Sequence, residues 1–158
     1  QNNLSVNHDE KLSVTGTVNF LFWVYPIFSG STLKSTTIFT KGNLLSKGEY
    51  TCEITTDKRI QYSFSTSTGS VVQIKSVKQI SEKKLTCVCI SKTPSKLTIY
   101  LNGKQDSTVT LTQQPATTQN PVIIGSGYDT IPLNGFPWGC LLNTADVWHL
   151  TDVPPVQL

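Results

Sequence analysis

The sequence predicts an all-β protein, specifically a two-sheet antiparallel β-sandwich of the jelly-roll type. Apolar, β-branched residues alternate with polar residues in runs of about five to eight. Gly, Pro, Asn and Asp interrupt these runs every ~8–12 residues, which is typical of turns between short strands. No stretch places apolar residues at helical spacing. The 158 residues suit a single domain, residues 1–158, that is long enough to bury a two-layer core.

The elements follow from this alternation. A polar lead-in, residues 1–11, is expected to pair at one sheet edge, and a Pro-containing tail, residues 152–158, is expected to follow the last strand. Between them we expect strands at residues 12–18, 18–26, 36–40, 49–56, 59–65, 71–80, 85–91, 96–101, 107–112, 122–124 and 141–150.

The clearest local signal is a hairpin made by residues 85–91 and 96–101. Both runs are rich in Val, Ile, Thr and Tyr, as a half-buried strand requires. Pro94 lies between them and has no N–H with which to continue a ladder. Asn102-Gly103 ends the second run and suits the positive φ angles of a tight turn.

This stretch also resembles a known family. Val88 and Ile90 take the two Val positions, and residues 99–104 (IYLNGK) take the L-Y-V-N-G-K positions, of the central hairpin in laminin-G-like domains of the concanavalin A-like lectin and glucanase superfamily. The chain departs from that pattern at residue 85, where Leu replaces the usual Trp, and at residues 86, 87 and 89. The resemblance implies a jelly-roll fold and raises the expectation of sugar binding.

Further segments resemble the family in the same order along the chain. Trp23, Val24 and Pro26 match its early F-S-x-W-V-x-P strand, and residues 120–127 (NPVIIGSG) match its N-P-L-Y-I-G-S-G. Residues 38–43, Gly135 and residues 147–148 match weaker patterns. The matches imply that Trp23 and Trp148 occupy core positions.

The residues give no support for catalysis. Retaining glycosidases need two carboxyl groups about 5–5.5 Å apart, which alternate positions of one strand can supply. No acids fall at i and i+2 inside an apolar strand of this chain, and the two histidines, His8 and His149, lie outside any nucleophile motif. No enzyme activity, cofactor or metal is expected. A calcium site of the laminin-G type would have to draw on Asp106 and Asp129, and this alternative stays open.

The first candidate ligand site lies in residues 128–139, YDTIPLNGFPWG. Flat aromatic rings can pack on a sugar ring while amide and carboxyl groups bind its hydroxyls. Tyr128, Asp129, Asn134 and Trp138 offer these groups on what is expected to be a rigid loop. Alternatively, Trp138 and Phe136 plug one end of the sandwich.

The second candidate is an outward sheet face that carries Arg59, Gln61 and Tyr100 together with Ser63 and Thr98. Arg59 could pair with the carboxylate of a sugar such as sialic acid. The alternative interpretation is an ordinary solvated face.

Charge and cysteine usage limit the other partners. A net charge of +3 with scattered lysines predicts neither nucleic-acid binding nor a charged membrane partner. The Glu82-Lys83-Lys84 cluster is interpreted as a solvated turn. No run reaches the roughly 18 apolar residues of a membrane span, so direct membrane insertion is not expected.

The four cysteines, Cys52, Cys87, Cys89 and Cys140, are expected to be free and mostly buried.

These observations predict a non-catalytic glycan- or receptor-binding domain on an extracellular face or a virion surface. Because the chain starts at Gln1 and contains no Met, we expect it to be part of a longer polypeptide. The expected partners are a cell-surface glycan or glycoprotein receptor and the rest of that polypeptide. The Ser/Thr/Asn-rich composition favours the attachment head of a viral spike, similar to the lectin-like heads of rotavirus spikes. The alternatives are a protein-binding adhesion module of the laminin-G type and a glucanase-like carbohydrate-binding domain that has lost its acids.

Overall fold

The computed structural model describes residues 4–26, 35–42, 49–125, 138–144 and 146–149. Apart from one short 3-10 turn (η1), all the regular structure in these ranges is β. The elements are β1 (Leu4–Val6), η1 (Glu10–Leu12), β2 (Val18–Val24), β3 (Thr36–Lys41), β4 (Tyr50–Ile54), β5 (Arg59–Ser65), β6 (Val71–Gln79), β7 (Thr86–Lys92), β8 (Lys96–Leu101), β9 (Lys104–Thr110), β10 (Val122–Ile124), β11 (Trp138–Thr144) and β12 (Asp146–His149).

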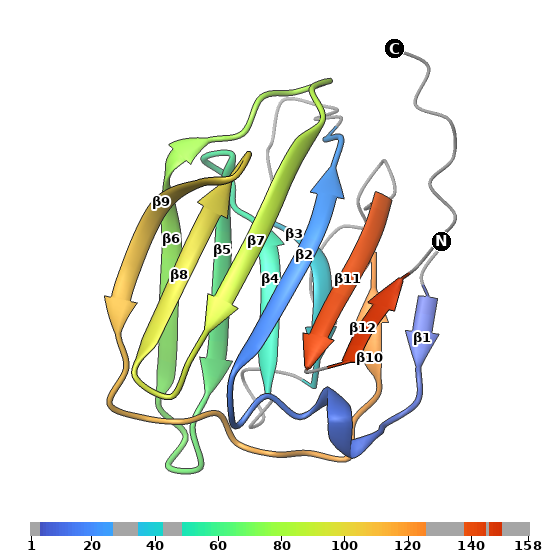
Figure 1. The fold of residues 1–158 in the computed structure, drawn as a ribbon, viewed down its shortest axis with the longest axis vertical. Helices are drawn as coiled ribbons and strands as arrows, with labels where there is room; N and C mark the ends of the chain where they lie inside the picture. The colour runs from blue at the N-terminus through green and yellow to red at the C-terminus, as the bar shows by residue number, and fades with distance from the viewer. Residues whose placement is uncertain (1–3, 27–34, 43–48, 126–137, 145, 150–158) are drawn as a thin grey trace.

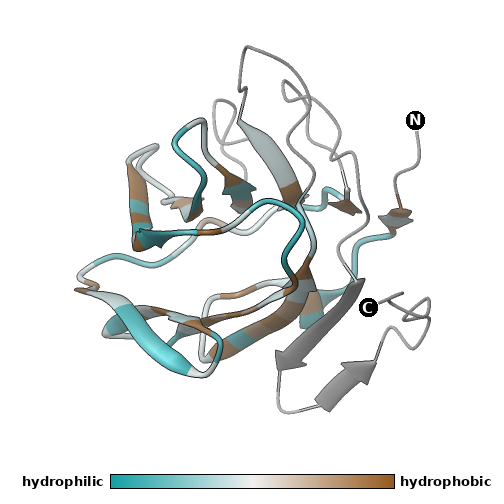
Figure 2. Ribbon diagram, turned by 90° about the horizontal axis from the view of Figure 1, so that it is seen from above, coloured by the Kyte–Doolittle hydropathy of each residue, from teal (hydrophilic) through white to brown (hydrophobic). Residues whose placement is uncertain are grey.

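The strands form two six-stranded antiparallel sheets that face each other (Figures 1 and 2). The first sheet has the order β1-β10-β3-β4-β5-β6 and the second has the order β12-β11-β2-β7-β8-β9. This arrangement confirms the predicted β-sandwich. β6 and β9 are the terminal strands of their sheets and lie close to each other, on the left in Figure 1.

The core lies between the sheets and is rich in aromatic rings. Phe20 of β2 contacts Phe39 and Tyr50 of the opposite sheet, with ring centroids 4.9 and 5.2 Å apart. Tyr62 of β5 joins the same cluster, and its side chain is fully buried. Rings at these separations add roughly 0.5–1.5 kcal/mol per pair beyond the area that they bury, so this cluster holds the two layers together.

The predicted hairpin is present as β7 and β8, and β8 turns directly into β9. Leu101 pairs with Lys104 across a two-residue turn in which Asn102 and Gly103 have φ angles of 50° and 76°. Positive φ at both central residues is the geometry that Asn-Gly favours in a tight hairpin. Asn102 also accepts a hydrogen bond from the N–H of Cys87 through Oδ1 at 2.9 Å, which fixes the turn against the start of β7.

Two sequence-based boundaries are wrong. Residues 12–18 form no separate strand, because Asp9 caps the η1 turn by accepting a hydrogen bond from the N–H of Lys11, and β2 begins only at Val18. The single strand expected at residues 141–150 is instead a hairpin of β11 and β12, in which Thr144 pairs with Asp146. The polar lead-in does pair at a sheet edge, since β1 lies against β10.

The lower end of the sandwich in Figure 1 is fastened by two buried lysines. The Nζ atom of Lys41 donates to the carbonyl oxygens of Thr118 and Asn120 at 3.0 and 2.7 Å and lies 3.4 Å from Glu49 Oε2. The Nζ atom of Lys92 donates to the carbonyl oxygen of Gly16 and to Gln114 Oε1, at 3.0 and 2.8 Å. Burial lowers the pKa of Lys92. Both lysines therefore hold the connection from β9 to β10, which runs along this end from one sheet to the other.

Candidate ligand-binding site

The outward sheet face predicted from the sequence does not exist as one surface. Arg59 and Gln61 lie on β5 of the first sheet, whereas Tyr100 lies on β8 of the second sheet. The chain passes from one layer to the other between β6 and β7, so strands that are close in sequence have their outer faces on opposite sides. Ser63 and Thr98, which were grouped with these residues, are buried. The prediction of a shared face is wrong.

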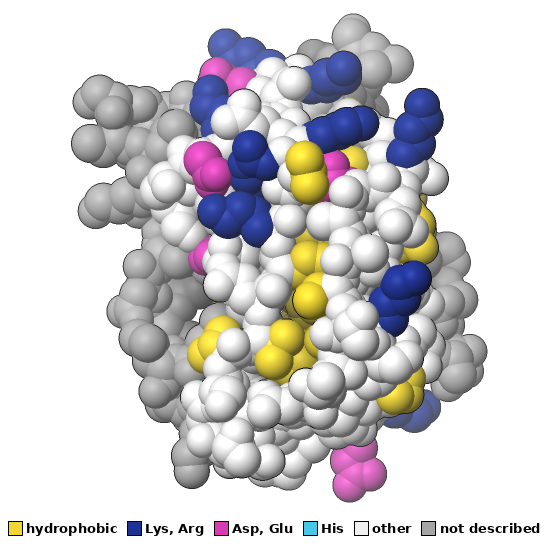
Figure 3. All heavy atoms as spheres, turned by 90° about the vertical axis from the view of Figure 1, so that its left-hand side faces the viewer, with side chains coloured by type: hydrophobic (Ala, Val, Ile, Leu, Met, Phe, Trp, Pro, Cys, Tyr) yellow, Lys and Arg dark blue, Asp and Glu magenta, His cyan; other side chains and the backbone are white. Residues whose placement is uncertain are grey.

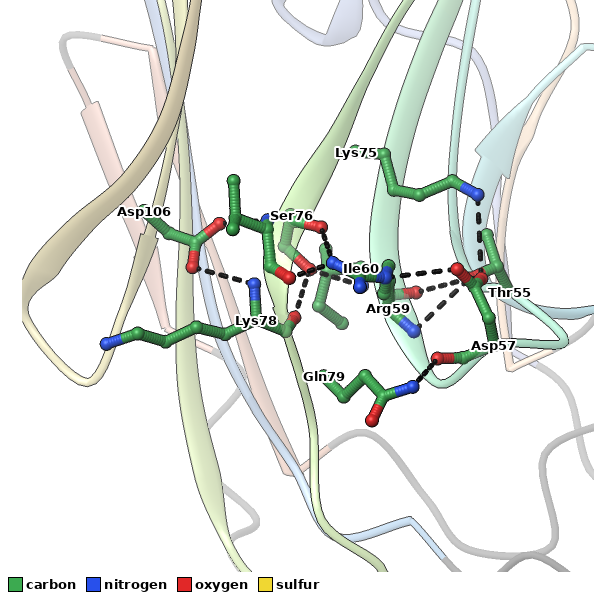
Figure 4. Close-up of polar contacts among 10 residues, drawn as sticks. Thr55, Asp57, Arg59, Ile60, Lys75, Ser76, Lys78, Gln79 and Asp106 are labelled. Carbon is green, nitrogen blue, oxygen red and sulfur yellow. Dashed lines mark hydrogen bonds and ion pairs between the residues drawn. The ribbon is translucent and has the colours of Figure 1, made fainter.

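Arg59 holds together an irregular part of the first sheet (Figure 4). The register between β5 and β6 shifts between Arg59 and Gln61, and Arg59 Nη1 donates to the carbonyl oxygens of Ser76 and Val77 in the bulged segment of β6. Arg59 Nε also forms an ion pair with Asp57 Oδ2 at 3.0 Å. These contacts give the guanidinium a structural role.

Polar residues near Arg59 also form hydrogen bonds and ion pairs within the protein. The hydrogen bond from the Thr55 hydroxyl is the main cause that holds the pKa of Asp57 below its ordinary value; desolvation opposes it, and the charge of Lys75 adds a smaller lowering effect. Gln61 Nε2 donates to Glu53 Oε1 at 2.6 Å. Both Arg59 and Gln61 are therefore bound to groups of the protein itself.

The outer face of the second sheet is more apolar. The register places Leu21, Cys89 and Tyr100 in one row across β2, β7 and β8, and places Trp23 beside Cys87 in the next row. Residues directly opposite each other in an antiparallel pair share a face, so these five side chains form one patch, called here the outer apolar patch. All of them are partly exposed.

Trp23 belongs to this patch and not to the core. Its side chain is 37% exposed, whereas Phe22 and Val24 beside it are buried between the sheets. The implied core position of Trp23 is therefore wrong. No disulfide joins the described cysteines: Cys52 lies buried in the core, and desolvation raises the pKa of both patch thiols, those of Cys87 and Cys89.

The loop site predicted from the sequence falls mostly outside the described residues. Tyr128, Asp129 and Asn134 lie there, so their role stays a prediction. Trp138 is the first residue of β11 and not part of a loop, and its register partner on β2 is Trp23.

A groove of about 280 Å³ opens at the upper end of the sandwich in Figure 1, where several strands begin or end. The residues that line it come from the end of β6, the connection to β7, the start of β7 and the β8–β9 turn: Lys78, Gln79, Ile80, Ser81, Lys84, Thr86, Leu101, Asn102 and Lys104.

Local hydrogen bonds fix the shape of this groove. The N–H of Ile80 donates to the carbonyl oxygen of Lys58 at 2.7 Å, and the N–H of Lys83 donates to that of Pro26 at 2.8 Å. On the other side, the N–H of Asn102 donates to the carbonyl oxygen of Cys87 at 2.8 Å. Ile80 and Leu101 are almost completely buried and supply an apolar floor. The groove is thus held by main-chain contacts and not by its exposed side chains.

Three exposed lysines, Lys78, Lys84 and Lys104, line the groove. Within the part of the chain that the structure describes, no ion pair joins any of them to an acid. Figure 3 shows Lys and Arg side chains gathered over the upper part of the face that β6 and β9 present, with a few acidic side chains among them. Asp106 lies nearby and accepts hydrogen bonds from the backbone N–H groups of Val77 and Lys78 (Figure 4).

This groove was not predicted from the sequence. Lys84 was assigned to a solvated turn, and Lys78 and Lys104 were given no role. A signal was present, because a short connection leaves the end of one strand and the start of the next at the same end of the fold, and such connections join β6 to β7 and β8 to β9. Lys78, Lys84 and Lys104 all lie within two residues of such a strand end.

The described residues give little support for a metal site or a membrane-spanning helix. No group of three or more His, Cys, Asp or Glu side chains in these ranges could hold a metal ion. Asp106, one of the two acids considered for calcium, binds backbone N–H groups instead. Among the described segments, no helix is long and apolar enough to cross a membrane.

The fold and the sequence together identify the family. The family model described as the concanavalin A-like lectin/glucanases superfamily matches residues 1–149. The chain belongs to this superfamily. No curated protein matches the sequence itself.

Solved structures of the same fold include toxin binding domains. The binding domain of botulinum neurotoxin serotype D/C is 16% identical, with a TM-score of 0.64 over 85% of this chain and 33% of that chain. The binding domain of botulinum neurotoxin DC in complex with SialylT is 17% identical, with a TM-score of 0.63 over 77% and 30%. The binding domain of Paraclostridial Mosquitocidal Protein 1 is 13% identical, with a TM-score of 0.63 over 80% and 34%. This member of the superfamily therefore spans about a third of each matched chain.

Proposed function

We propose that the chain is a non-catalytic domain that binds a glycan on a cell-surface receptor. The observation that carries the proposal is the groove at the upper end of the sandwich. An apolar floor with hydrogen-bonding groups around it is the arrangement that small-molecule sites use to bind and orient a ligand. Membership of a superfamily named for lectins raises the expectation of a sugar, although fold alone does not assign a function.

The names of the solved structures support a binding role. Each of the three is described as a binding domain, and one was solved with SialylT. The sequence supports the absence of catalysis, because the paired carboxylates of a glucanase strand are missing. A receptor-binding role would place the domain on an extracellular or virion surface, as part of a larger polypeptide and with no nucleic acid as partner.

Two kinds of parent protein are compatible with the proposed function. The sequence composition favours a viral spike head, whereas the toxin binding domains share its fold. Both carriers would present the domain to receptors on a host cell, so the proposed binding role does not depend on the choice between them.

A glycan array probed with the purified 158-residue chain tests the proposed function. We expect concentration-dependent binding to at least one class of cell-surface glycan, and no binding by the heat-unfolded chain. A silent array together with tight binding to a protein receptor on deglycosylated cells would overturn the proposal. Trp138→Ala in the same assay checks whether the predicted loop site contributes: a weaker signal from a folded variant would show that it does, and an unchanged signal would favour the groove alone.

A protein receptor is the second candidate, and the outer apolar patch favours it. A partly exposed Trp and Tyr beside apolar neighbours on the outer face of a sheet suit a protein contact. A solved structure with the same fold is described as a binding domain in complex with rat synaptotagmin II. Loss of receptor binding in Trp23→Ser, with glycan binding intact, would favour this candidate.

A further inference from the structure

We propose that the groove at the upper end of the sandwich binds an acidic sugar unit, one that carries a carboxylate or a sulfate. The inference rests on the proposed glycan-binding function and names the ligand class and the residues that select it. Lys78, Lys84 and Lys104 supply the charge, and the floor made by Ile80 and Leu101 supports the sugar ring.

The charge of the groove comes from side chains at three separate positions of the fold. Lys78 lies near the end of β6, Lys84 lies just before β7, and Lys104 begins β9. The fold brings the three lysines to the same groove, and none of them has an acidic partner within the described ranges. Their ammonium groups are then available to a ligand, and a concave surface lined by one sign of charge focuses the field on it.

Acidic groups near the groove do not cancel this charge. The Asp106 carboxylate is directed to the backbone N–H groups of Val77 and Lys78, and Glu82 lies in the turn without lining the groove. Lys83 stands next to Glu82 in the same turn. The local balance around the groove is therefore positive.

The other polar side chains that line the groove supply mainly hydrogen-bond donors. Asn102 Oδ1 is occupied by the N–H of Cys87, which leaves its amide N–H groups for a ligand. Thr86 and Ser81 contribute hydroxyl groups. A site rich in donors and ammonium groups complements a ligand rich in acceptors and negative charge, because hydrogen bonds to ionised acceptors are about twice as strong as neutral ones.

The size of the groove limits the ligand to about one sugar ring. Its volume of about 280 Å³ lies just below the ~300–1,000 Å³ of most small-molecule sites. The three lysines line one hollow at the end of the sandwich, so the site suits a compact anion better than an extended nucleic-acid backbone. An acidic sugar at the end of a glycan chain fits both the charge and the size.

Calorimetric titration of the 158-residue chain with 3′-sialyllactose, 3′-sulfolactose and lactose tests the inference. We expect each acidic sugar to bind about ten-fold more tightly than lactose, because the lysines contact its anionic group together and lactose has no charge for them to contact. Raising the salt concentration should weaken the binding of the acidic sugars and leave the affinity for lactose unchanged. The stronger of the two acidic sugars identifies the anion that the groove prefers.

The double variant Lys84→Glu/Lys104→Glu locates the site. Both side chains are exposed, so we expect a folded protein in which binding of the acidic sugars falls by at least about ten-fold. Lys96→Glu is the matched control, because Lys96 is also exposed but lies at the opposite end of β8 from the groove. An equal loss in the control would mean a diffuse charge effect and would overturn the assignment to the groove.

The outcomes separate the inference from the proposed function. Equal affinity for lactose and the acidic sugars, or full binding by the double variant, would overturn the acidic groove while leaving a glycan-binding function in place. No binding of these three sugars, together with an array signal from neutral glycans alone, would also overturn only the inference. A silent array would overturn the proposed function as well.

Discussion

Phe22 and Trp23 are neighbours in β2, but their side chains are on opposite faces of the second sheet. Phe22 is buried and contacts Phe39 across the core, with ring centroids 5.6 Å apart. Trp23 contributes to the outer apolar patch and is 37% exposed. Because successive residues of a strand alternate between its faces, the larger ring of the two is the one that water reaches.

Substitution of these two rings should therefore give different losses of stability. We expect Phe22→Ala to cost about 3–5 kcal/mol because it leaves a cavity among core rings. Trp23→Ala should cost only about 1 kcal/mol, as is usual for a partly exposed position. Urea denaturation of the two variants and the wild type measures both values. Equal destabilisation would show that Trp23 is packed as tightly as a core residue.

At the level of elements, the bulge in β6 links the two sheets at their terminal strands. Asp106 of β9 accepts hydrogen bonds from the N–H groups of Val77 and Lys78, while Arg59 of β5 binds the carbonyl oxygens of Ser76 and Val77. A bulge leaves backbone groups outside the regular ladder, and here side chains from two neighbouring strands satisfy them.

Removal of the Asp106 carboxylate should loosen this edge. We expect Asp106→Ala to lower the free energy of unfolding by about 1–3 kcal/mol, because two backbone donors lose a charged acceptor. Hydrogen exchange at the amides of Val77 and Lys78 should accelerate more than at core amides such as that of Tyr62. Glu82→Ala is the control, since Glu82 is an exposed acid for which the structure gives no such contacts. Unchanged exchange at both amides would contradict the role of Asp106.

The strands and turns of this fold differ in how well the sequence predicts them. The β7–β8 hairpin and the Asn102-Gly103 turn were predicted correctly, because alternation and turn chemistry are properties of adjacent residues. The strand at residues 12–18 was wrong, because the cap at Asp9 starts a 3-10 turn that alternation does not reveal. The sequence shows which residues share a face of one strand but not which sheet that strand joins. Tyr100 was therefore grouped wrongly with Arg59, and the three groove lysines were missed.

At the scale of the whole molecule, the two ends of the sandwich are built differently. The lower end is closed by buried charges, because Lys41 and Glu49 are both fully buried and both bind the connection from β9 to β10. The upper end carries exposed lysines around an open groove. The buried ion pair of Lys41 and Glu49 therefore lies at one end, and the candidate site lies at the other.

A double-mutant cycle at the lower end tests this division. We expect Lys41→Met to cost about 3–5 kcal/mol, because it leaves the Glu49 carboxylate buried without its partner. The double variant Lys41→Met/Glu49→Gln should recover part of that loss, since no charge then stays buried. Thermal and chemical denaturation of the single and double variants measures the coupling. Additive losses would contradict a buried pair, and glycan binding should persist in every variant that folds.

The contact between Asp106 and the β6 bulge also affects how the chain behaves at high concentration. An open edge strand offers free N–H groups to a strand of another molecule, and this is a common start of aggregation. Asp106 occupies two of those groups on β6 and adds a negative charge beside them. Redesign of the neighbouring lysines for a new ligand should therefore leave Asp106 in place, because we expect its carboxylate to limit association of two molecules through this edge.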